Sequence, residues 1–282
     1  MEISIIIVTW NSQDFIRNCL DSIYLLPDKV RYEIMVVDNH SSDQTKKIVR
    51  EFYPEVDLIE NRANLGYAQA NNQGIEKSQG KYILLLNPDT QLLENSLTLM
   101  YEFMEANPRV GALGPKLLNP DKSIQPSCRE FPTFSTLIWE FFGLSRIFPK
   151  SKIFGRWRMG YFAFDQPKEV DQPMGSCLML RRETLEDVGT FDENFSMFFN
   201  DVDLCYRTKN AKWKIYFYPD AQVVHHKGAS TRKVKRRMIW LSHLAFYKFF
   251  KKYKTGLANR LLLFFFCLPL FLSALVRIIL KR

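Results

Sequence analysis

Short apolar runs and longer polar stretches alternate through the first 118 residues. Four of the runs are β-branched and almost continuously apolar, as buried parallel strands usually are: Ile3–Val8, Ile34–Val37, Val56–Ile59 and Tyr82–Leu86. The stretches between them predict helices at Gln13–Leu26, Asp43–Tyr53 and Tyr67–Ser78, with Ser42 or Asp43 capping the second. This alternation predicts an α/β fold with a mostly parallel open sheet, flanking helices and ligands at the carboxyl ends of the strands.

The pattern changes at about residue 119. Residues 119–174 are rich in Phe, Trp, Pro and Arg without a clear period, which predicts an insertion or lid over the binding site. Regular elements return after Gly175, with strands at Cys177–Leu180, Lys214–Tyr218 and Ala221–Val224 and helices at Arg182–Val188 and Asp201–Ala211. We therefore expect one domain over residues 1–230, followed by a tail over residues 231–282.

The tail has two parts, one apolar and one basic. Leu261–Leu280 carries a single charge, Arg277, and is long enough to cross a bilayer, although Pro269 and the arginine weaken a straight span. Lys233–Lys254 interleaves lysines with Trp, Leu, Ile, Met and Phe, which is typical of a helix lying on anionic lipid. We expect amphipathic and hydrophobic membrane-associating helices here, with a pair of core helices closing the domain as the alternative.

Charge is unevenly distributed. No Asp or Glu follows Asp220, whereas 14 of the 39 Lys and Arg lie there, so the rest of the chain carries 25 basic against 30 acidic residues. A basic tail on a mildly acidic body predicts an anionic membrane surface as partner; no motif supports nucleic-acid binding, which we do not expect. Five scattered cysteines argue against a disulfide framework and a structural zinc site, and the N-terminus lacks the basic region of a signal peptide, so we expect a reducing compartment.

Polar clusters follow three of the predicted strands. They are Thr9-Trp10-Asn11-Ser12, Asp38-Asn39 with Ser41-Ser42-Asp43, and Asn87-Pro88-Asp89. Ordinary turns and helix caps explain any one of them, but three in succession predict a single cleft at the carboxyl ends of the strands. The chain has no G-x-G-x-x-G after its first strand and no G-x-x-x-x-G-K-[ST], which disfavours NAD-dependent hydride transfer and P-loop chemistry. A bound phosphate would then need a hard metal, for which Asp89 is the natural ligand.

Six segments occur in one specific order: SIIIVTWNS, VVDNHSSD, NLGYAQANNQGI, LLLNPDT, GSCLMLRRETLEDVGTFDENF and NDVDLCYR. In this order they resemble the family 2 glycosyltransferases of the GT-A fold, and most of all the bacterial rhamnosyltransferase-like branch. The resemblance covers about residues 3–230. It implies an inverting enzyme that takes a sugar from a nucleotide diphosphate with the help of a divalent metal.

The resemblance also implies a nucleotide site along the first half of the sheet. Asp38 would accept hydrogen bonds from the base or ribose, supported by Asn39 and Asp43. Gly66 would open a helix whose N–H groups favour the diphosphate, with Asn71 pointing inward; ordinary helix-surface polarity is the alternative for the asparagine. The other implied contacts are Thr9 and Asn11 at the nucleobase, Asn87 at the nucleotide, and Arg207 at the diphosphate or in a surface ion pair.

A metal site is implied by Asn87-Pro88-Asp89, which matches the family's D-x-D motif with the first acid replaced. Asp89 would carry most of the coordination of Mg²⁺ or Mn²⁺, a Lewis acid for the leaving nucleoside diphosphate. His225 lies three residues before Gly228, as the histidine that completes the metal site in this family often does. A satisfied core histidine is the alternative.

The family usually has Glu-Asp where this chain has Asn200-Asp201. By this match Asp201 is the general base that deprotonates the acceptor hydroxyl on the face opposite the leaving group, which gives inversion. Matching the helix dipole is the alternative for Asp201, and a stronger one for Asp203. Gly175 and Ser176 would border the acceptor and sugar pockets.

The expected reaction moves a sugar, rhamnose being the first candidate, from a dTDP- or UDP-sugar to a hydroxyl of a lipid-linked glycan in cell-surface polysaccharide synthesis. The tail motivates the lipid-linked acceptor and a place on the cytoplasmic face of the bacterial inner membrane, with residues 119–174 on the acceptor side. Asn87 and Asn200, each replacing an acid, leave a catalytically inactive membrane-bound protein of the same fold as the alternative. A processive polysaccharide synthase is disfavoured, because the chain lacks several long spans and a Q-x-x-R-W motif.

Overall fold

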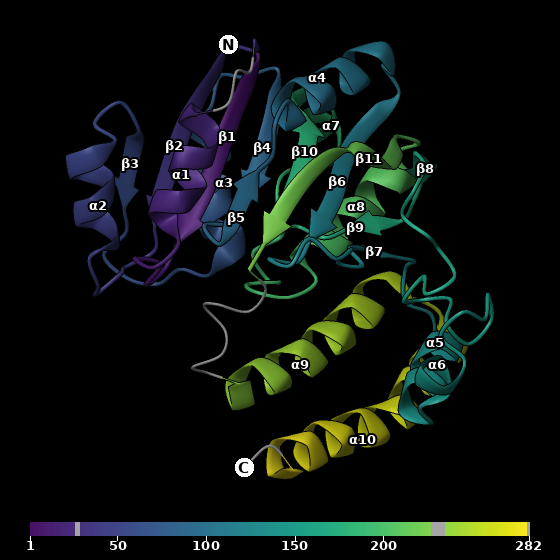
Figure 1. The fold of residues 1–282 in the computed structure, drawn as a ribbon. Helices are drawn as coiled ribbons and strands as arrows, with labels where there is room; N and C mark the ends of the chain where they lie inside the picture. The colour runs from purple at the N-terminus through teal and green to yellow at the C-terminus, as the bar shows by residue number, and fades with distance from the viewer. Residues whose placement is uncertain (26–28, 227–234, 281–282) are drawn as a thin grey trace.

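The computed structural model describes residues 1–25, 29–226 and 235–280. A mixed β-sheet with helices on both faces forms the body, and two long helices at the C-terminal end of the chain lie beside one edge of it (Figure 1). The sheet order is β3 (Asp57–Glu60), β2 (Tyr32–Asp38), β1 (Ile3–Thr9), β4 (Tyr82–Leu86), β10 (Cys177–Arg181), β6 (Val110–Leu118), β11 (Lys214–His225) and β5 (Thr90–Leu92), with β8 (Lys168–Glu169) paired to β11.

The first four strands confirm the predicted parallel sheet. β1 pairs in parallel with β2 on one side and β4 on the other, and β3 continues the sheet beyond β2. Thr9 stands opposite Asp38 in the register, so the polar strand ends reach the same edge together. The connecting helices are α1 (Ile16–Tyr24), α2 (Thr45–Phe52) and α3 (Tyr67–Lys77).

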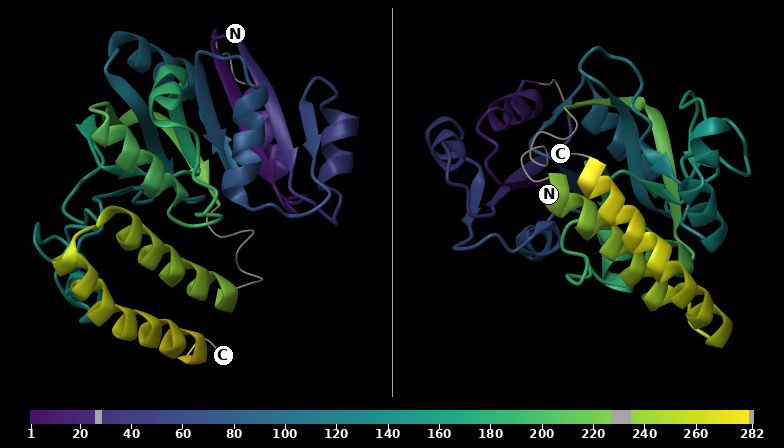
Figure 2. Two further views of the ribbon diagram at one scale, coloured as in Figure 1. Left: turned by 180° about the vertical axis from the view of Figure 1, so that it is seen from behind. Right: turned by 90° about the horizontal axis from the view of Figure 1, so that it is seen from below.

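Alternate residues of β1 enter two cores on opposite faces of the sheet, as the two-residue period of a strand requires. Ile3, Ile5 and Ile7 belong to one core, and Ile6 belongs to the other. Helices α1, α2 and α4 (Ser96–Ala106) cover the first core, and α3, α7 (Arg182–Val188) and α8 (Asn200–Asn210) cover the second (Figure 2).

The pattern of apolar residues did not predict α4 or β6, and β6 is a central strand. Its sequence, VGALGPKLL, contains two glycines and a proline, which normally argue against a central strand. The tertiary structure requires a glycine here: a Cβ on Gly114 would lie 2.3 Å from the Cβ of Pro173. Close packing against the neighbouring segment therefore decides the residue type.

The two strands predicted at Lys214–Tyr218 and Ala221–Val224 form one strand, β11. Its register against β6 shifts between Tyr218 and Gln222. Pro219 lies within this shift and has no N–H to donate, so the pairing is interrupted locally while the strand continues. β10 runs antiparallel to both of its neighbours, which makes the sheet mixed rather than wholly parallel.

Residues 119–174 and the tail pack against each other. A third apolar cluster joins Phe199 of α8 to Phe249 and Phe250, and Phe134 packs against it. The carboxyl ends of the parallel strands point toward the first tail helix, with the second on its far side (Figures 1 and 2). The elements of these two regions are β7 (Cys128–Arg129), α5 (Phe134–Phe141), α6 (Leu144–Ile147), β9 (Gln172–Pro173), α9 (Lys235–Tyr253) and α10 (Leu257–Leu280).

Among the described residues, one helix is long enough and apolar enough to cross a membrane. It is the stretch Leu257–Leu275 within α10. Most of its surface is exposed, and the apolar side chains include Phe264 at 73% and Phe265 at 70% exposure. The two tail helices therefore differ: α10 is largely exposed, whereas α9 contributes Ala245, Phe249 and Phe250 to the third apolar cluster.

Candidate active site

Asp38 ends β2 and is completely buried. Its Oδ1 accepts a hydrogen bond from the Thr9 hydroxyl at 3.1 Å, and its Oδ2 accepts one from the Ser41 N–H at 2.9 Å. The Asn39 N–H also donates to the Thr9 carbonyl, at 2.8 Å. The ends of β1 and β2 thus fix this carboxylate in one orientation.

The turns after these two strands are bound to each other as well. Asn11, which has a positive φ of 51°, accepts the Ser42 N–H on its Oδ1 at 2.8 Å, and its own N–H donates to the Ser41 hydroxyl at 2.9 Å. Asp43 accepts N–H groups of Gln13 (3.1 Å) and Thr45 (3.0 Å), and so joins the first turn to the start of α2. The two turns form one continuous rim.

Asn39 was predicted to support Asp38. Its side chain instead binds the loop before α3. Its Oδ1 accepts the Leu65 N–H at 2.9 Å, and its Nδ2 donates to Asn64 Oδ1 at 3.0 Å and to the Gly66 carbonyl at 3.1 Å. The amide uses both ends on this loop because the loop passes directly over the end of β2.

Gly66 opens α3 as predicted, with φ 88° and ψ 168°. The N–H groups that follow it were predicted to face the diphosphate. Those of Tyr67 and Ala68 instead both donate to the Ser196 carbonyl, at 2.7 and 3.4 Å. The segment before α8 packs onto the start of the helix and takes its donors. Asn71 is buried and points inward as predicted, donating to the Tyr67 carbonyl at 2.8 Å.

Asp89 and His225 come together from distant parts of the chain. Asp89 Oδ1 lies 3.5 Å from His225 Nε2, and both side chains are less than one-tenth exposed. The Asp89 carbonyl also accepts the His226 N–H at 2.8 Å, because β5, just after Asp89, pairs with the end of β11. Gly228, which singled out His225 in the sequence, lies outside the described residues.

Gln125 determines which nitrogen of His225 carries the proton. Its Nε2 donates to Asn119 Oδ1 at 2.8 Å and to the His225 carbonyl at 3.2 Å, so its Oε1 is left to accept from His225 Nδ1 at 2.7 Å. The Nε2 of a neutral His225 is then unprotonated and directs its lone pair toward Asp89. Two acceptor atoms facing each other are repulsive unless a proton or a metal cation lies between them.

This donor set fits Mg²⁺ or Mn²⁺, which take carboxylate oxygen and, for manganese, imidazole nitrogen. The preceding turn is rigid: the Asn87 N–H donates to the Ser176 carbonyl at 2.9 Å, and the Asn87 carbonyl accepts the Thr90 hydroxyl at 2.6 Å. Among the residues that the structure describes, no three His, Cys, Asp or Glu side chains gather as a ready-made metal cluster. The pair would therefore leave several coordination positions to substrate oxygens and water.

Asp201 stands at the start of α8. Its Oδ2 accepts from Gln172 Nε2 at 2.9 Å and from the Gly175 N–H at 3.1 Å, and its Oδ1 accepts the Val202 N–H at 2.9 Å. Burial raises the pKa of this carboxyl, and the three hydrogen bonds partly oppose that rise. A half-buried carboxylate with a raised pKa is a better proton acceptor than an exposed one.

The Gly175-Ser176 turn connects Asp201 to the metal side. Gly175 packs so closely that a Cβ would lie 3.2 Å from that of Asp201, and its carbonyl accepts the Tyr67 hydroxyl at 2.9 Å. Burial raises the pKa of Tyr67, and the charges of Asp201 and, more weakly, Asp89 raise it further. The Ser176 carbonyl in turn accepts the Asn87 N–H, so this turn lies between Asp201 and the Asn87-Pro88-Asp89 turn.

Arg207 does not reach this site, so its predicted contact with the diphosphate is wrong. Its guanidinium donates to Asp203 at 2.9 Å and to the carbonyls of Val188, Gly189 (3.0 Å) and Thr190 (2.6 Å). One turn of helix separates Arg207 from Asp203, and the side chain folds back over the loop after α7. The ion pair is not a surface one, because Asp203 is completely buried.

Sequence reasoning missed three residues that orient the site: Tyr67, Gln125 and Gln172. Two of them lie in the 119–174 segment, which has no periodic pattern, and each contacts a residue far along the chain. Gln125 is 100 residues from His225 and Gln172 is 29 from Asp201. A neutral amide in an irregular segment carries no signal of such a role.

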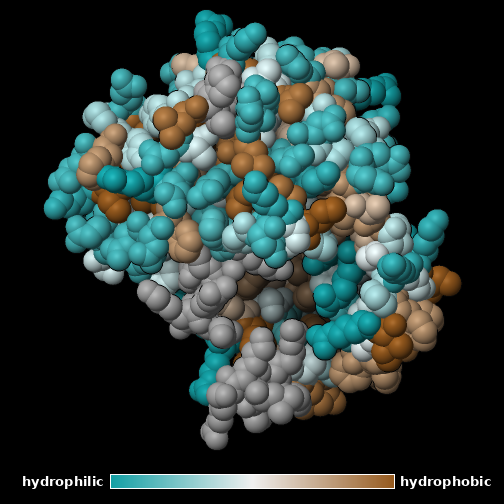
Figure 3. All heavy atoms as spheres, viewed as in Figure 1, coloured by the Kyte–Doolittle hydropathy of each residue, from teal (hydrophilic) through white to brown (hydrophobic). Residues whose placement is uncertain are grey.

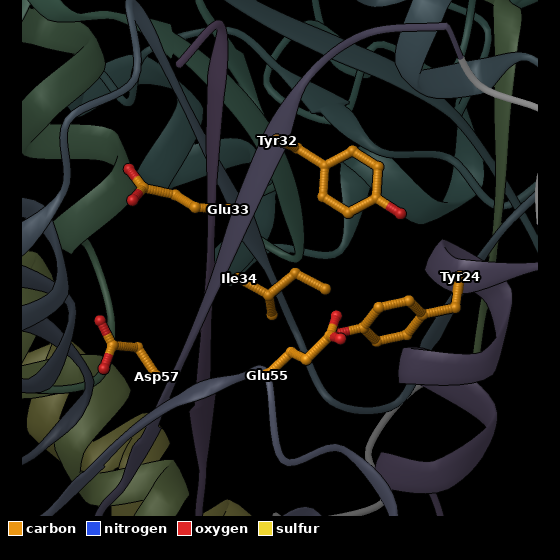
Figure 4. A pocket seen from close by; sticks show the side chains of 6 residues that line it. All are labelled: Tyr24, Tyr32, Glu33, Ile34, Glu55 and Asp57. Carbon is orange, nitrogen blue, oxygen red and sulfur yellow. The ribbon is translucent and has the colours of Figure 1, made fainter.

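A cavity of about 230 Å³ lies elsewhere, at the amino end of β2 (Figure 4). Its walls come from α1, from β2 and from the segment leading into β3. The side chains around it are Tyr24, Tyr32, Glu33, Ile34, Glu55 and Asp57. It lies near the amino ends of the strands, whereas the candidate site lies at their carboxyl ends, so the cavity has no part in that site.

Comparison with known proteins places these features in a family. The model for "Glycosyl transferase family 2" matches residues 4–189. The chain is 29% identical over 267 residues to the N-acetylglucosaminyl-diphospho-decaprenol L-rhamnosyltransferase of Mycobacterium tuberculosis, covering 89% of this chain and 85% of that protein. It is 27% identical over 238 residues to the rhamnosyltransferase WbbL of Escherichia coli, covering 81% and 84%.

The fold comparison agrees. The structure of S. aureus TarS 1-349 in complex with UDP superposes with a TM-score of 0.57 at 17% identity, covering 87% of this chain and 65% of that one. At this identity the likeness shows the shared GT-A fold alone. Because the family model matches well over half of the sequence, the chain belongs to the family 2 glycosyltransferases.

Proposed function

We propose that this glycosyltransferase moves a sugar, rhamnose first among the candidates, from a dTDP- or UDP-sugar to a hydroxyl of a lipid-linked glycan. The names of the two relatives, both rhamnosyltransferases, support the sugar, and the decaprenol-linked substrate in the mycobacterial name supports the acceptor. The observation that carries the proposal is the network at the Gly175-Ser176 turn. The Gly175 N–H donates to Asp201, and the Ser176 carbonyl accepts the N–H of Asn87, two residues before Asp89, which faces His225.

Asp201 is the proposed general base. Its carboxylate takes the proton from the acceptor hydroxyl, whose oxygen then attacks the anomeric carbon as the bond to the diphosphate breaks. The pKa of Asp201, raised by burial, favours proton uptake, and Gln172 and Gly175 hold the carboxylate in place. A single base on the face opposite the leaving group gives inversion of configuration.

Asp89 and His225 are the proposed ligands of Mg²⁺ or Mn²⁺. Such a metal, when bound, supplies positive charge to the leaving diphosphate. Gln125 holds His225 as the tautomer whose Nε2 is free to coordinate. Thr9, Asn11, Asp38, Asn39, Gly66, Asn71 and Asn87 remain our proposal for the nucleotide side, and Gly175 and Ser176 for the sugar and acceptor side.

The proposed location is the cytoplasmic face of the bacterial inner membrane. The strand ends that carry the site point toward α9 and α10 (Figure 1). A small cavity separates the segment Asn194–Phe198 from α9, where it is lined by apolar residues and Lys248. A lipid-linked acceptor arriving from the membrane would meet the site from this side, which is consistent with residues 119–174 lying on the acceptor side.

The test is a transfer assay on the purified full chain with dTDP-rhamnose and UDP-sugars as donors and a polyprenyl-diphosphate sugar as acceptor, with and without Mn²⁺. We expect a single sugar to be added with inverted anomeric configuration, as read by NMR of the product. Repeated addition would indicate a processive synthase.

A catalytically inactive partner protein is the alternative, because Asn87 and Asn200 each replace an acid. Calorimetry with dTDP and Mn²⁺ tests it. The proposed enzyme binds the nucleotide more tightly when the metal is present, whereas metal-independent binding together with absent transfer would favour the inactive protein.

A further inference from the structure

The outer side of α10 is a continuous apolar stripe. Leu261, Leu268 and Leu275 are spaced seven residues apart, so they lie on one side of the helix, and they are 53%, 69% and 52% exposed. α10 lies on the far side of α9 from the sheet, so this stripe faces away from the body (Figures 1 and 2). The other large exposed residues of α10 are Leu257, Leu262, Phe264, Phe265 and Leu272.

A second apolar group lies in the 119–174 segment. Phe142, Ile147 and Ile153 are 68%, 64% and 64% exposed, and Phe141 and Phe148 are also exposed. Figure 3 shows hydrophobic side chains at the lower right and along the lower edge, over α5–α6 and α10. We call the exposed apolar side chains of α10 and of residues 141–153 together the docking face.

The two parts of the docking face are held together. Phe134, at the start of α5, contacts Phe250 of α9 and Phe266 of α10, with ring centroids 4.7 and 5.4 Å apart. These contacts belong to the third apolar cluster, which also includes residues of α8. The segment and the tail therefore pack against each other and against α8 of the body.

Charge indicates what this face meets. No acidic residue occurs from Phe141 to Phe164 or after Asp220, although these two segments are far apart in the sequence. The exposed cations Arg146, Lys150 and Lys152 alternate with the exposed apolar residues of the docking face. Apolar and basic side chains mixed in this way suit the interface of an anionic bilayer, where the chains insert and the cations meet the headgroups.

The pairing of α9 with α10 determines how α10 meets that bilayer. The two helices run antiparallel, with the ring centroids of Trp240 and Phe271 5.2 Å apart and His243 Nε2 3.1 Å from Ser273 Oγ. If α10 crossed the bilayer with this packing kept, α9 would cross beside it, and its exposed Arg236 and Arg237 would have to pass through the hydrocarbon core to the far surface. Burying two such charges is strongly unfavourable.

We propose that α10 lies in the plane of the membrane interface instead of spanning it, and that residues 141–153 insert beside it as a second anchor in an anionic leaflet. The catalytic body then stands on the membrane with its strand ends directed at the lipid surface. This inference goes beyond the proposed function and rests on it only for the membrane as partner.

The depth of α10 tests the first part. Leu261, Leu268 and Leu275 are changed singly to cysteine, labelled with bimane in a Cys267→Ser background, and bound as full chain to vesicles of phosphatidylglycerol and phosphatidylcholine. The other four cysteines are buried. Nitroxide lipids of known depth should quench all three labels at one shallow level. A deepest position at Leu268, with Leu275 protected from quenchers outside the vesicle, would show a spanning helix and overturn the proposal.

The second anchor is tested by the pair Phe142→Glu and Ile147→Glu in one chain. Binding to the same vesicles, measured by flotation, should weaken about tenfold or more, because two inserted side chains are lost. Phe52→Glu on α2, equally apolar and 55% exposed, is the matched control and should bind as the wild type does. The pair Phe142→Ser and Ile147→Ser should weaken binding to the vesicles less than the glutamate pair does.

Equal binding of the glutamate pair and the control would show that residues 141–153 do not insert. Binding to purely phosphatidylcholine vesicles should be weaker than to anionic ones, and equal binding would exclude the proposed anionic surface. Neither experiment contains a nucleotide sugar or an acceptor, so a negative docking result and a negative transfer assay remain separate outcomes.

Discussion

The proposed donor side and the proposed catalytic side of the site are built in different ways. The turns after β1 and β2 are bound to each other by hydrogen bonds between neighbouring strand ends, such as Thr9 to Asp38 and Ser42 to Asn11. On the other side, contacts from segments far along the chain orient the functional side chains: Gln172 and the Gly175 N–H hold Asp201, and Gln125 holds His225. A change on the catalytic side should therefore alter chemistry or metal binding with little effect on the donor side.

The largest effect is expected from Asp201→Asn. Loss of a general base lowers turnover by about 10²- to 10⁴-fold, whereas affinity for the nucleotide should stay within about twofold because the strand-end rim is untouched. Initial-rate kinetics and calorimetry with dTDP measure the two quantities. Transfer at the wild-type rate would rule out Asp201 as the base.

Gln125→Ala should act on the metal rather than on the base. Without its acceptor, the Nδ1–H of His225 is no longer fixed, and loss of such a partner typically weakens metal affinity by about 10- to 100-fold. Manganese binding is measured by electron paramagnetic resonance, independently of activity. Gln125→Glu keeps an acceptor for Nδ1 and should recover most of the affinity. If Gln125→Ala binds Mn²⁺ normally, Gln125 does not position a metal ligand.

On the donor side, Gly66→Ala tests the shape of the loop. The φ of 88° and ψ of 168° are confined to glycine, and the new Cβ would lie 3.0 Å from the Ser196 carbonyl. We expect the free energy of unfolding in urea to fall by about 1–3 kcal/mol. Gly143→Ala is the control, since Gly143 has φ 72° and ψ 6° with nothing within 4 Å of the added Cβ, and it should cost less. If both substitutions lower the free energy of unfolding equally, the close approach of Gly66 to Ser196 does not contribute to the effect.

The smallest effect concerns pH. Gln172→Leu removes a hydrogen bond that favours the charged form of Asp201, so the pKa of this carboxyl should rise further above its usual value. The base works when deprotonated, so the acidic limb of kcat/KM should move to higher pH, while the rate at high pH changes less. Gln79→Leu, at an exposed position, should leave the profile unchanged. A shift of the same size in both variants would exclude a specific role for Gln172.

The corrections to the predicted site follow the same division. The N–H groups of Tyr67 and Ala68 were expected to face the diphosphate, but the Ser196 carbonyl occupies them. Arg207 was expected at the diphosphate and instead clamps Asp203 and the loop after α7. In both cases the hydrogen-bond donors bind a segment from the second half of the chain. The residues next to these donors in the sequence do not indicate that contact.

The sequence alone determined where the strands of the first half end and which polar residues stand there. The short, almost continuously apolar runs and the β–α alternation place Thr9, Asp38 and Asp89 at one edge of a parallel sheet. The type of chemistry followed from the order of the motifs, which needs no distances.

The tertiary structure alone decided which partners orient those residues and how the tail is directed. Gln125 and Gln172 lie in a segment without periodicity, and β6 is a central strand in spite of its glycines and proline. An apolar helix of 24 residues fits either across or along a bilayer. Our proposal that it lies along the bilayer rests on its packing against α9 and α5, because contacts between residues far apart in the chain depend on their positions in space and leave no local pattern.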